Sequence, residues 1–215
     1  MNRFTRRTGE PTLKPSITHD ISLMGTWRFF QAMLSFQQQR DPIIQWSYPD
    51  ATDHSVAVIT HQNFDKLPTL TAMIAASPTI GCWSPTFSFG VIKQWFDATY
   101  DNNVIKMNDP MLMASFNNII SLPWGLRFGA DFSFRGKGYT QNVYINRNNY
   151  ICNVSLQKSF LKDALTVEIR GNDLFHERIT DATVYMDRLI GSTRSSYDSR
   201  EFVLTLRYKF NMTPS

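Results

Sequence analysis

The residues of this chain that could bind a metal ion are four histidines and two cysteines, and their spacing argues against such a site. His19 and His176 are isolated; only His54 and His61 are near one another, and no carboxylate or cysteine lies at ligand spacing beside them. Cys82 and Cys152 lie 70 residues apart without a CxxC pattern. They fit neither a zinc site nor a disulfide framework, and we interpret them as small apolar residues within strands.

Catalytic and phosphate-binding motifs are also missing. No nucleophile elbow, zinc-protease helix, P-loop or dinucleotide fingerprint occurs. The glycine-containing segment Phe134–Thr140 follows a strand and precedes no helix, so a phosphate cradle is not expected there. Asp173, in the NDLF segment, is interpreted as a strand-closing residue. Three further aspartates are too widely spaced for a calcium loop: Asp181, Asp187 and Asp198. We therefore predict no enzyme, no cofactor and no metal.

The composition suits a chain that shows aromatic rings to something other than water. Of 215 residues, 42% are hydrophobic and 13% aromatic, while only 19% are charged, below the usual quarter. The net charge of +4 is spread along the chain without a basic helix, so nucleic-acid binding is not expected. No run of 18 apolar residues exists to form a transmembrane helix, but a closed β-barrel also spans a membrane.

Period-two alternation of apolar and polar residues recurs along the chain and predicts an all-β, up-and-down antiparallel fold. The clearest strand is Leu126–Arg135, in which Leu, Phe and Ala alternate with Arg, Asp and Ser. A strand within Leu67–Ala76 has a possible extension from Val56 to Asn63. With these, nine strands are predicted: 19–26, 30–38, 67–76, 86–95, 112–121, 126–135, 150–158, 165–172 and 200–210.

The connections between these strands alternate strictly between short and long. This rhythm is typical of a meandering membrane barrel, with tight turns at one rim and long loops at the other. Lysines and arginines within the strands fall almost entirely on the polar face, and a charge facing lipid at the midplane would cost about 2 to 4 kcal/mol. Aromatic residues gather at strand ends, as in membrane girdles: Trp27, Phe29, Trp83, Trp95, Phe96, Trp124, Phe160, Tyr208 and Phe210. The alternative is that these rings plug the ends of a soluble core.

Three stretches carry a resemblance to a known family. Gly9–Leu23 (GEPTLKPSITHDISL) resembles a G-N-P-x-L-K-P loop leading into a strand. Leu156–Arg178 resembles a pattern of strand, K-x-F-x-x-x-x-L turn, strand and N-D-L/I-F close, and Ser195–Asn211 resembles a closing strand. Together they resemble the C-terminal part of a TonB-dependent outer-membrane receptor. Glu10, where the family usually has Asn or Asp, and the polar tail after Phe210 depart from its pattern.

The resemblance implies that residues 1–215 are about nine strands of a larger, 22-stranded type of transmembrane barrel. The signal peptide, the TonB-contacting box and the plug domain of that family are not seen in this sequence, so a truncated or split receptor is expected. The implied partners are outer-membrane lipid, the rest of the barrel and plug, and a TonB-type transducer that acts only through the plug. The barrel-assembly machinery would read the closing strand at Phe202, Leu204, Leu206, Tyr208 and Phe210.

The implied function is uptake of a siderophore, glycan or similar nutrient across the bacterial outer membrane, and the substrate itself stays open. Two other functions also stay open: a small stand-alone outer-membrane barrel of structural or adhesion type, and a soluble β-sandwich binding module. Aromatic residues in the long loops could stack on a ligand or pack against one another. They are Trp46, Tyr48, Tyr100, Tyr139, Tyr144, Tyr185 and Tyr197.

Overall fold

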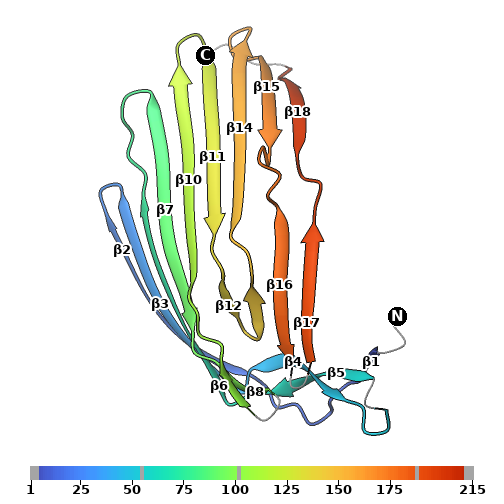
Figure 1. Ribbon diagram of the computed structural model, residues 1–215. Helices are drawn as coiled ribbons and strands as arrows, with labels where there is room; N and C mark the ends of the chain where they lie inside the picture. The colour runs from blue at the N-terminus through green and yellow to red at the C-terminus, as the bar shows by residue number, and fades with distance from the viewer. Residues whose placement is uncertain (1–4, 54–55, 101–102, 187–188, 211–215) are drawn as a thin grey trace.

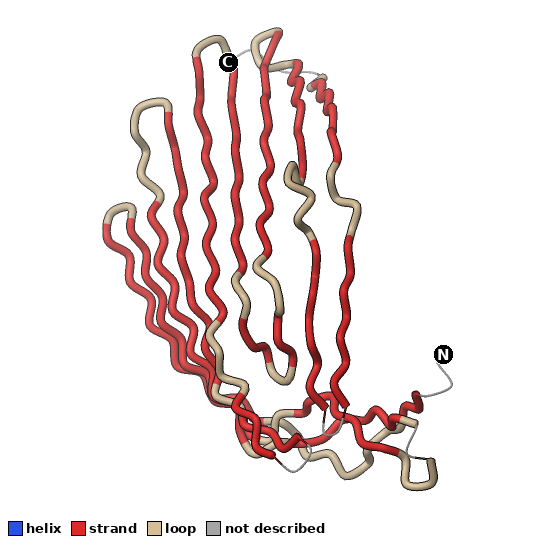
Figure 2. The backbone as a smooth tube through the Cα atoms, in the orientation of Figure 1, coloured by secondary structure: helices blue, strands red, loops and turns tan. Residues whose placement is uncertain are grey.

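The computed structural model describes residues 5–53, 56–100, 103–186 and 189–210, and these residues form strands and connecting turns without a helix (Figures 1 and 2). Nine strands form one antiparallel sheet in the order β18-β15-β14-β11-β10-β7-β6-β3-β2. Their bounds are β2 Ile17–Trp27, β3 Phe30–Arg40, β6 Lys66–Ala76, β7 Trp83–Gln94, β10 Met111–Leu122, β11 Leu126–Arg135, β14 Asn149–Phe160, β15 Leu165–Asn172 and β18 Glu201–Tyr208. These are the nine predicted strands, with ends that differ by a few residues.

Each short connection is a tight turn at the same end of the sheet, the top in Figure 1. The turns span residues 28–29, 77–82, 123–125 and 161–164. They reverse the chain by means of left-handed backbone, as at Arg28 (φ 55°), Trp124 (φ 62°) and Gly125 (φ 70°). We call this end the turn end, and the opposite end the loop end.

The register of the sheet separates two faces. One cross-strand row runs Phe87, Phe116, Phe132 and Cys152, and the first two rings stack at 4.6 Å. The next row along these strands, on the other face, contains Ser88, Ser115 and Ser133. We call these the apolar face and the polar face. Since side chains alternate along every strand, one register fixes both faces across all nine strands.

The apolar face is exposed in this structure. Phe202 on β18 is 77% exposed and Leu23 on β2 is 72% exposed, and other large apolar side chains between them are also uncovered. Water does not favour such a surface, and exposed apolar patches of this extent mark interaction sites or contact with lipid.

The sequence predicts long loops for the four long connections. In the structure, each of them instead contains a hairpin of its own. These hairpins are β4 (Ile43–Pro49) with β5 (Ala57–Asn63), β8 (Asp97–Tyr100) with β9 (Asn103–Lys106), β12 (Gly138–Thr140) with β13 (Val143–Ile145), and β16 (Ile179–Met186) with β17 (Leu189–Ser196). The predicted extension from Val56 to Asn63 is thus a separate strand, β5. β1 (Thr5–Arg7) pairs with it in parallel, so the antiparallel prediction is wrong for this one pair.

The apolar core lies among these hairpins, where the loop-end residue Leu67 of β6 joins it, and not along the sheet. It contains Ile44, Trp46, Leu67, Phe96, Ala98 and Met107. Phe64 links two of its rings edge-to-face, at 5.1 Å from both Trp46 and Phe96. Phe96, which the sequence predicts as a girdle residue, is instead buried at the loop end, because the chain turns there into the β8 hairpin.

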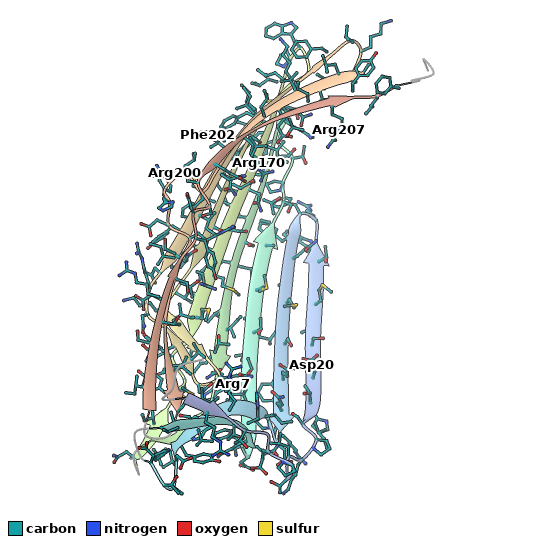
Figure 3. All side chains as sticks on the ribbon, turned by 90° about the vertical axis from the view of Figure 1, so that its right-hand side faces the viewer. Arg7, Asp20, Arg170, Arg200, Phe202 and Arg207 are labelled. Carbon is teal, nitrogen blue, oxygen red and sulfur yellow. The ribbon has the colours of Figure 1, made fainter. Side chains whose placement is uncertain are left out.

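The nine-stranded sheet is curved but not closed within the described residues, so β2 and β18 are its edges (Figure 3). Asp20 and Arg207, labelled in Figure 3, mark these two edge strands. Neighbours in an antiparallel sheet alternate in direction, so the first and ninth strands run the same way.

Candidate functional site: the polar face and the loop cap

The described parts of the long connections form one interlocked body at the loop end, which we call the loop cap: residues 41–53, 56–65, 95–100, 103–110, 136–148, 173–186 and 189–200. Gln94, 4% exposed at the end of β7, donates from Nε2 to the carbonyls of Met107 (2.9 Å) and Gln141 (2.7 Å). Asn142, 3% exposed, donates to the carbonyls of Gln45 (3.0 Å) and Tyr185 (2.9 Å). These two amides join all four connections, because their partners lie in different hairpins.

A second group of contacts fixes the third connection to the fourth. Asn146 donates to the Asp181 carboxylate at 2.8 Å and to the Thr183 hydroxyl at 2.9 Å. Arg147 forms an ion pair with Glu177. The loop cap is therefore held by directed polar contacts as well as by its apolar core.

Three predicted ligand-contact residues meet in the cap. The Tyr139 ring lies 4.7 Å from that of Tyr144 and 6.1 Å from that of Tyr185. Burial, together with the neighbouring Tyr185, raises the pKa of Tyr139 to about 12. Tyr139 therefore keeps its phenolic proton at neutral pH, and the three rings form one aromatic cluster in the cap.

The other predicted ligand-contact residues lie apart. Trp46 is buried in the cap core, whereas Tyr48 and Tyr197 are exposed. The side chain of Tyr100 lies outside the described part of the chain. The structure thus brings together Tyr139, Tyr144 and Tyr185 only, and ligand contact by any of the seven stays a prediction.

Asp173 fastens the fourth connection to the end of the sheet. It follows β15 in a left-handed conformation (φ 46°), and its N–H donates to Asn153 Oδ1 at 2.9 Å. Its carboxylate is 2% exposed and accepts bonds from the Ser199 hydroxyl and from the N–H groups of Glu177 and Arg178. Burial raises its pKa, but these hydrogen bonds outweigh burial, so the pKa lies below its usual value. The prediction of a strand-closing residue fits this geometry.

The polar face carries its charges on one side of the sheet. Apart from Asp20 on β2, they lie on β11, β15 and β18: Arg127, Asp131, Arg135, Glu168, Arg170, Glu201 and Arg207. Arg170 and Asp131 are 3.8 Å apart, across β14. A polar hollow of about 850 Å³ lies here, lined by Glu168, Arg170, Asp173, Arg178 and Glu201 among others. This part of the face can hold water or a charged partner.

The other side of the polar face carries a row of methionines instead. Met24, Met33, Met73 and Met113 follow one another across β2, β3, β6 and β10, with Gly90 of β7 between the last two. A Cβ atom at Gly90 would lie 3.0 Å from Met73 Cγ, so the missing side chain leaves room for the thioethers. Sequence reasoning missed this row, because the register between strands decides it.

No group of three or more histidine, cysteine or acidic side chains that could hold a metal ion occurs among the described residues. His54 lies outside them, so the pair of His54 and His61 cannot be placed. Within the same part of the chain, no helix is long and apolar enough to cross a membrane.

The predicted closing strand presents one continuous apolar edge. Phe202, Leu204, Leu206 and Tyr208 share the apolar face through their register with β15, and Tyr208 contacts Phe210 edge-to-face at 4.7 Å. β18 pairs with β15 on one side and with no described strand on the other. Its role in barrel assembly stays a prediction.

The sheet is curved and antiparallel, with an exposed apolar face, a polar face that carries charges, and folded loops at one end. These features are typical of the wall of a membrane β-barrel. The chain belongs to the outer membrane protein beta-barrel family, whose model matches residues 1–208. Its location is the bacterial outer membrane. No curated protein and no solved structure matches the chain significantly.

Proposed function

We propose that this chain forms part of the barrel wall and the outer loops of a TonB-dependent receptor that takes up a siderophore, glycan or similar nutrient. The observation that carries the proposal is the direction of the two edge strands. Since β2 and β18 run the same way, antiparallel closure needs an odd number of further strands between them. Nine strands taken from a 22-stranded transporter barrel leave such an odd remainder.

The polar face supports the same proposal. Small barrels fill their interior with side chains, whereas 22-stranded transporters hold a plug in the lumen. Here the charged residues Arg170 and Glu168 border a wide polar hollow. Burying these charges against apolar side chains would be costly, so a polar partner is favoured. In the proposed receptor this surface contacts the plug, and the energy transducer acts on the plug and not on this chain.

The edges can be tested by disulfide trapping. With Cys82 and Cys152 replaced by serine, Ser22→Cys on β2 is combined in turn with Val203→Cys and Thr205→Cys on β18. All three positions face the polar side. The proposal expects no intrachain disulfide in the outer membrane, because other strands separate the edges. A disulfide formed in high yield would mean direct closure of β2 on β18.

Uptake itself requires a genetic test. Deletion of the gene is expected to abolish growth on one siderophore or glycan, and loss of the TonB-type transducer is expected to do the same. Growth of the deletion strain on every such nutrient at the wild-type rate would contradict the proposal, as would uptake that continues without the transducer.

A small stand-alone barrel of structural or adhesion type is the second candidate. It is favoured by the family description, which names a barrel and no transport. It would require β2 and β18 to pair in parallel, and the disulfide experiment distinguishes it. We do not propose the soluble β-sandwich, because the exposed apolar face and the outer-membrane family leave it without support.

A further inference from the structure

Three basic residues project from the apolar face, where charges are otherwise rare. Arg40 of β3 and Lys66 of β6 are cross-strand partners, in one row with Ile17. Lys93 of β7 shares a row with Leu70. Parity therefore points all three side chains toward the membrane and away from the lumen.

All three residues lie toward the loop end of their strands: Arg40 and Lys66 share one row, and Lys93, opposite Leu70, is four residues from that row. Arg40 is ten residues from Phe30, Lys66 is ten from Ala76, and Lys93 is ten from Trp83, where the second residue of each pair is the turn end of its strand. Ten residues of a strand tilted by about 40° rise by about 25 Å, which is the height of the apolar band. The three cations thus lie at the border between hydrocarbon and headgroups, at the loop end.

The cations form a patch and not a ring. β3, β6 and β7 are consecutive neighbours in the sheet. On three other strands the apolar-face residue ten positions from the turn end is uncharged: Ile17 of β2, Leu112 of β10 and Tyr150 of β14. A general preference for basic residues at this level would not select three adjacent strands.

No carboxylate of the described residues forms an ion pair with these cations. The ion pairs of the described residues lie elsewhere: Arg6–Asp50, Arg147–Glu177 and Arg170–Asp131. Like charges directly opposite one another, as at Arg40 and Lys66, are unfavourable unless an anion lies between them. Lys93 Nζ lies 5.4 Å from the centroid of the Trp95 ring, which holds the ammonium beside an aromatic residue at headgroup level. The described residues therefore supply no negatively charged ion-pair partner for this basic patch.

We propose that this patch binds the phosphate groups of a lipid in the outer leaflet of the outer membrane, with Arg40 and Lys66 on one phosphate and Lys93 beside them. Long loops of such barrels face outward, so the patch meets the outer leaflet. A guanidinium binds phosphate through two hydrogen bonds, and the two ammonium groups add point charges. The proposal rests on the outer-membrane location and not on nutrient transport, so each can fail without the other.

The test uses the full chain, together with whatever strands complete its barrel, extracted from outer membranes in mild detergent. Native mass spectrometry then measures binding of bisphosphorylated lipid A, of its fully dephosphorylated form, and of inorganic phosphate. The variants are Lys66→Gln and the triple variant Arg40→Gln/Lys66→Gln/Lys93→Gln. The matched control is Lys158→Gln, which faces lipid near the turn end with its ammonium 5.2 Å from the Phe160 ring.

Affinity for bisphosphorylated lipid A is expected to fall about fivefold in Lys66→Gln and roughly a hundredfold in the triple variant, the usual contribution of basic residues near an anionic surface. Lys158→Gln is expected to leave it unchanged. Equal binding of dephosphorylated lipid A, or an equal loss in the control, would overturn the proposal. Displacement of the lipid by millimolar inorganic phosphate would also overturn it, in favour of a free-phosphate site. Heat-modifiable gel migration of each variant shows whether its barrel is folded, and the single variant serves if the triple one is not.

Discussion

Gln94 and Gln141, 47 residues apart, bind each other reciprocally: Gln94 Nε2 donates to the Gln141 carbonyl at 2.7 Å, and the Gln141 N–H donates to Gln94 Oε1 at 2.6 Å. The Gln94 side chain thus makes the two hydrogen bonds to the Gln141 backbone that a neighbouring strand would otherwise make. Because Gln94 ends a wall strand and Gln141 lies in the β12–β13 turn, this pair couples the sheet to the loop cap.

Gln94→Ala is expected to loosen the loop cap. The change leaves the Gln141 N–H and the carbonyls of Gln141 and Met107 without this partner, and each buried unsatisfied group costs about 1 to 3 kcal/mol. Hydrogen exchange should accelerate in residues 136–148, while the wall strands stay protected. Gln31→Ala, on the exposed polar face of β3, is the matched control. Unchanged exchange in 136–148 would contradict the coupling.

Gly138→Ala is expected to disrupt the β12 hairpin. Gly138 has φ 151°, and a Cβ atom there would lie 2.9 Å from the backbone of Met111, which cannot rotate away. We expect a loss of about 1 to 3 kcal/mol in stability, measured by thermal unfolding in detergent. Gly25→Ala meets nothing within 4 Å and should be neutral. Equal melting temperatures for the two variants would refute this reading of Gly138.

Asp173→Asn is expected to remove a pH dependence of the fourth connection. Hydrogen bonds hold the folded pKa of Asp173 below the usual aspartate value of about 3.9, so its stabilisation is fully present above about pH 4 and is lost as the pH falls through the folded pKa. Hydrogen exchange in residues 174–199 of the wild type should therefore accelerate as the pH falls below 4, after correction for intrinsic rates. The variant should be looser at pH 7, by about 1 to 3 kcal/mol, and should not change with acid.

Leu204→Arg and Thr205→Arg test which face meets lipid. Leu204 lies on the apolar face and Thr205 borders the polar hollow. An arginine at the first position should cost about 2 to 4 kcal/mol near the midplane, whereas the second position should accept it. The measurement is the yield of heat-modifiable protein in the outer membrane. Equal yields, or a lower yield for Thr205→Arg, would reverse the assignment of the faces.

The wall of the barrel could be predicted from the sequence, because its signal is local. Along Leu126–Arg135, the lipid side demands apolar residues and the lumen side tolerates charge, so each strand shows its alternation without its neighbours. Even Leu112–Ser121, where Asn117 and Asn118 interrupt the pattern, was found, since the short turn that follows it reverses the chain.

The loop cap could not be predicted, because its order depends on distant partners. Val143–Ile145 becomes a strand only through its pairing with β12 and β16, and its sequence shows no clear alternation. Likewise, Trp46 looks like a surface ring in its own segment and is buried only because Phe64 and the β8 hairpin cover it. The basic patch at Arg40 and Lys66 was missed for a related reason: register, and not sequence, places these residues together.

The reciprocal amides and the buried rings of the loop cap also have a consequence for the binding of a solute in the receptor that we propose. Loops that must fold around a ligand lose conformational entropy at binding, which weakens the complex. Hairpins already joined through Asn142 and Gln94 have lost that entropy during folding, so an arriving molecule meets a surface of fixed shape. In the receptor that we propose, selection at the mouth would therefore work by fit to a preformed shape, and entry of a solute would require the cap to move as one unit.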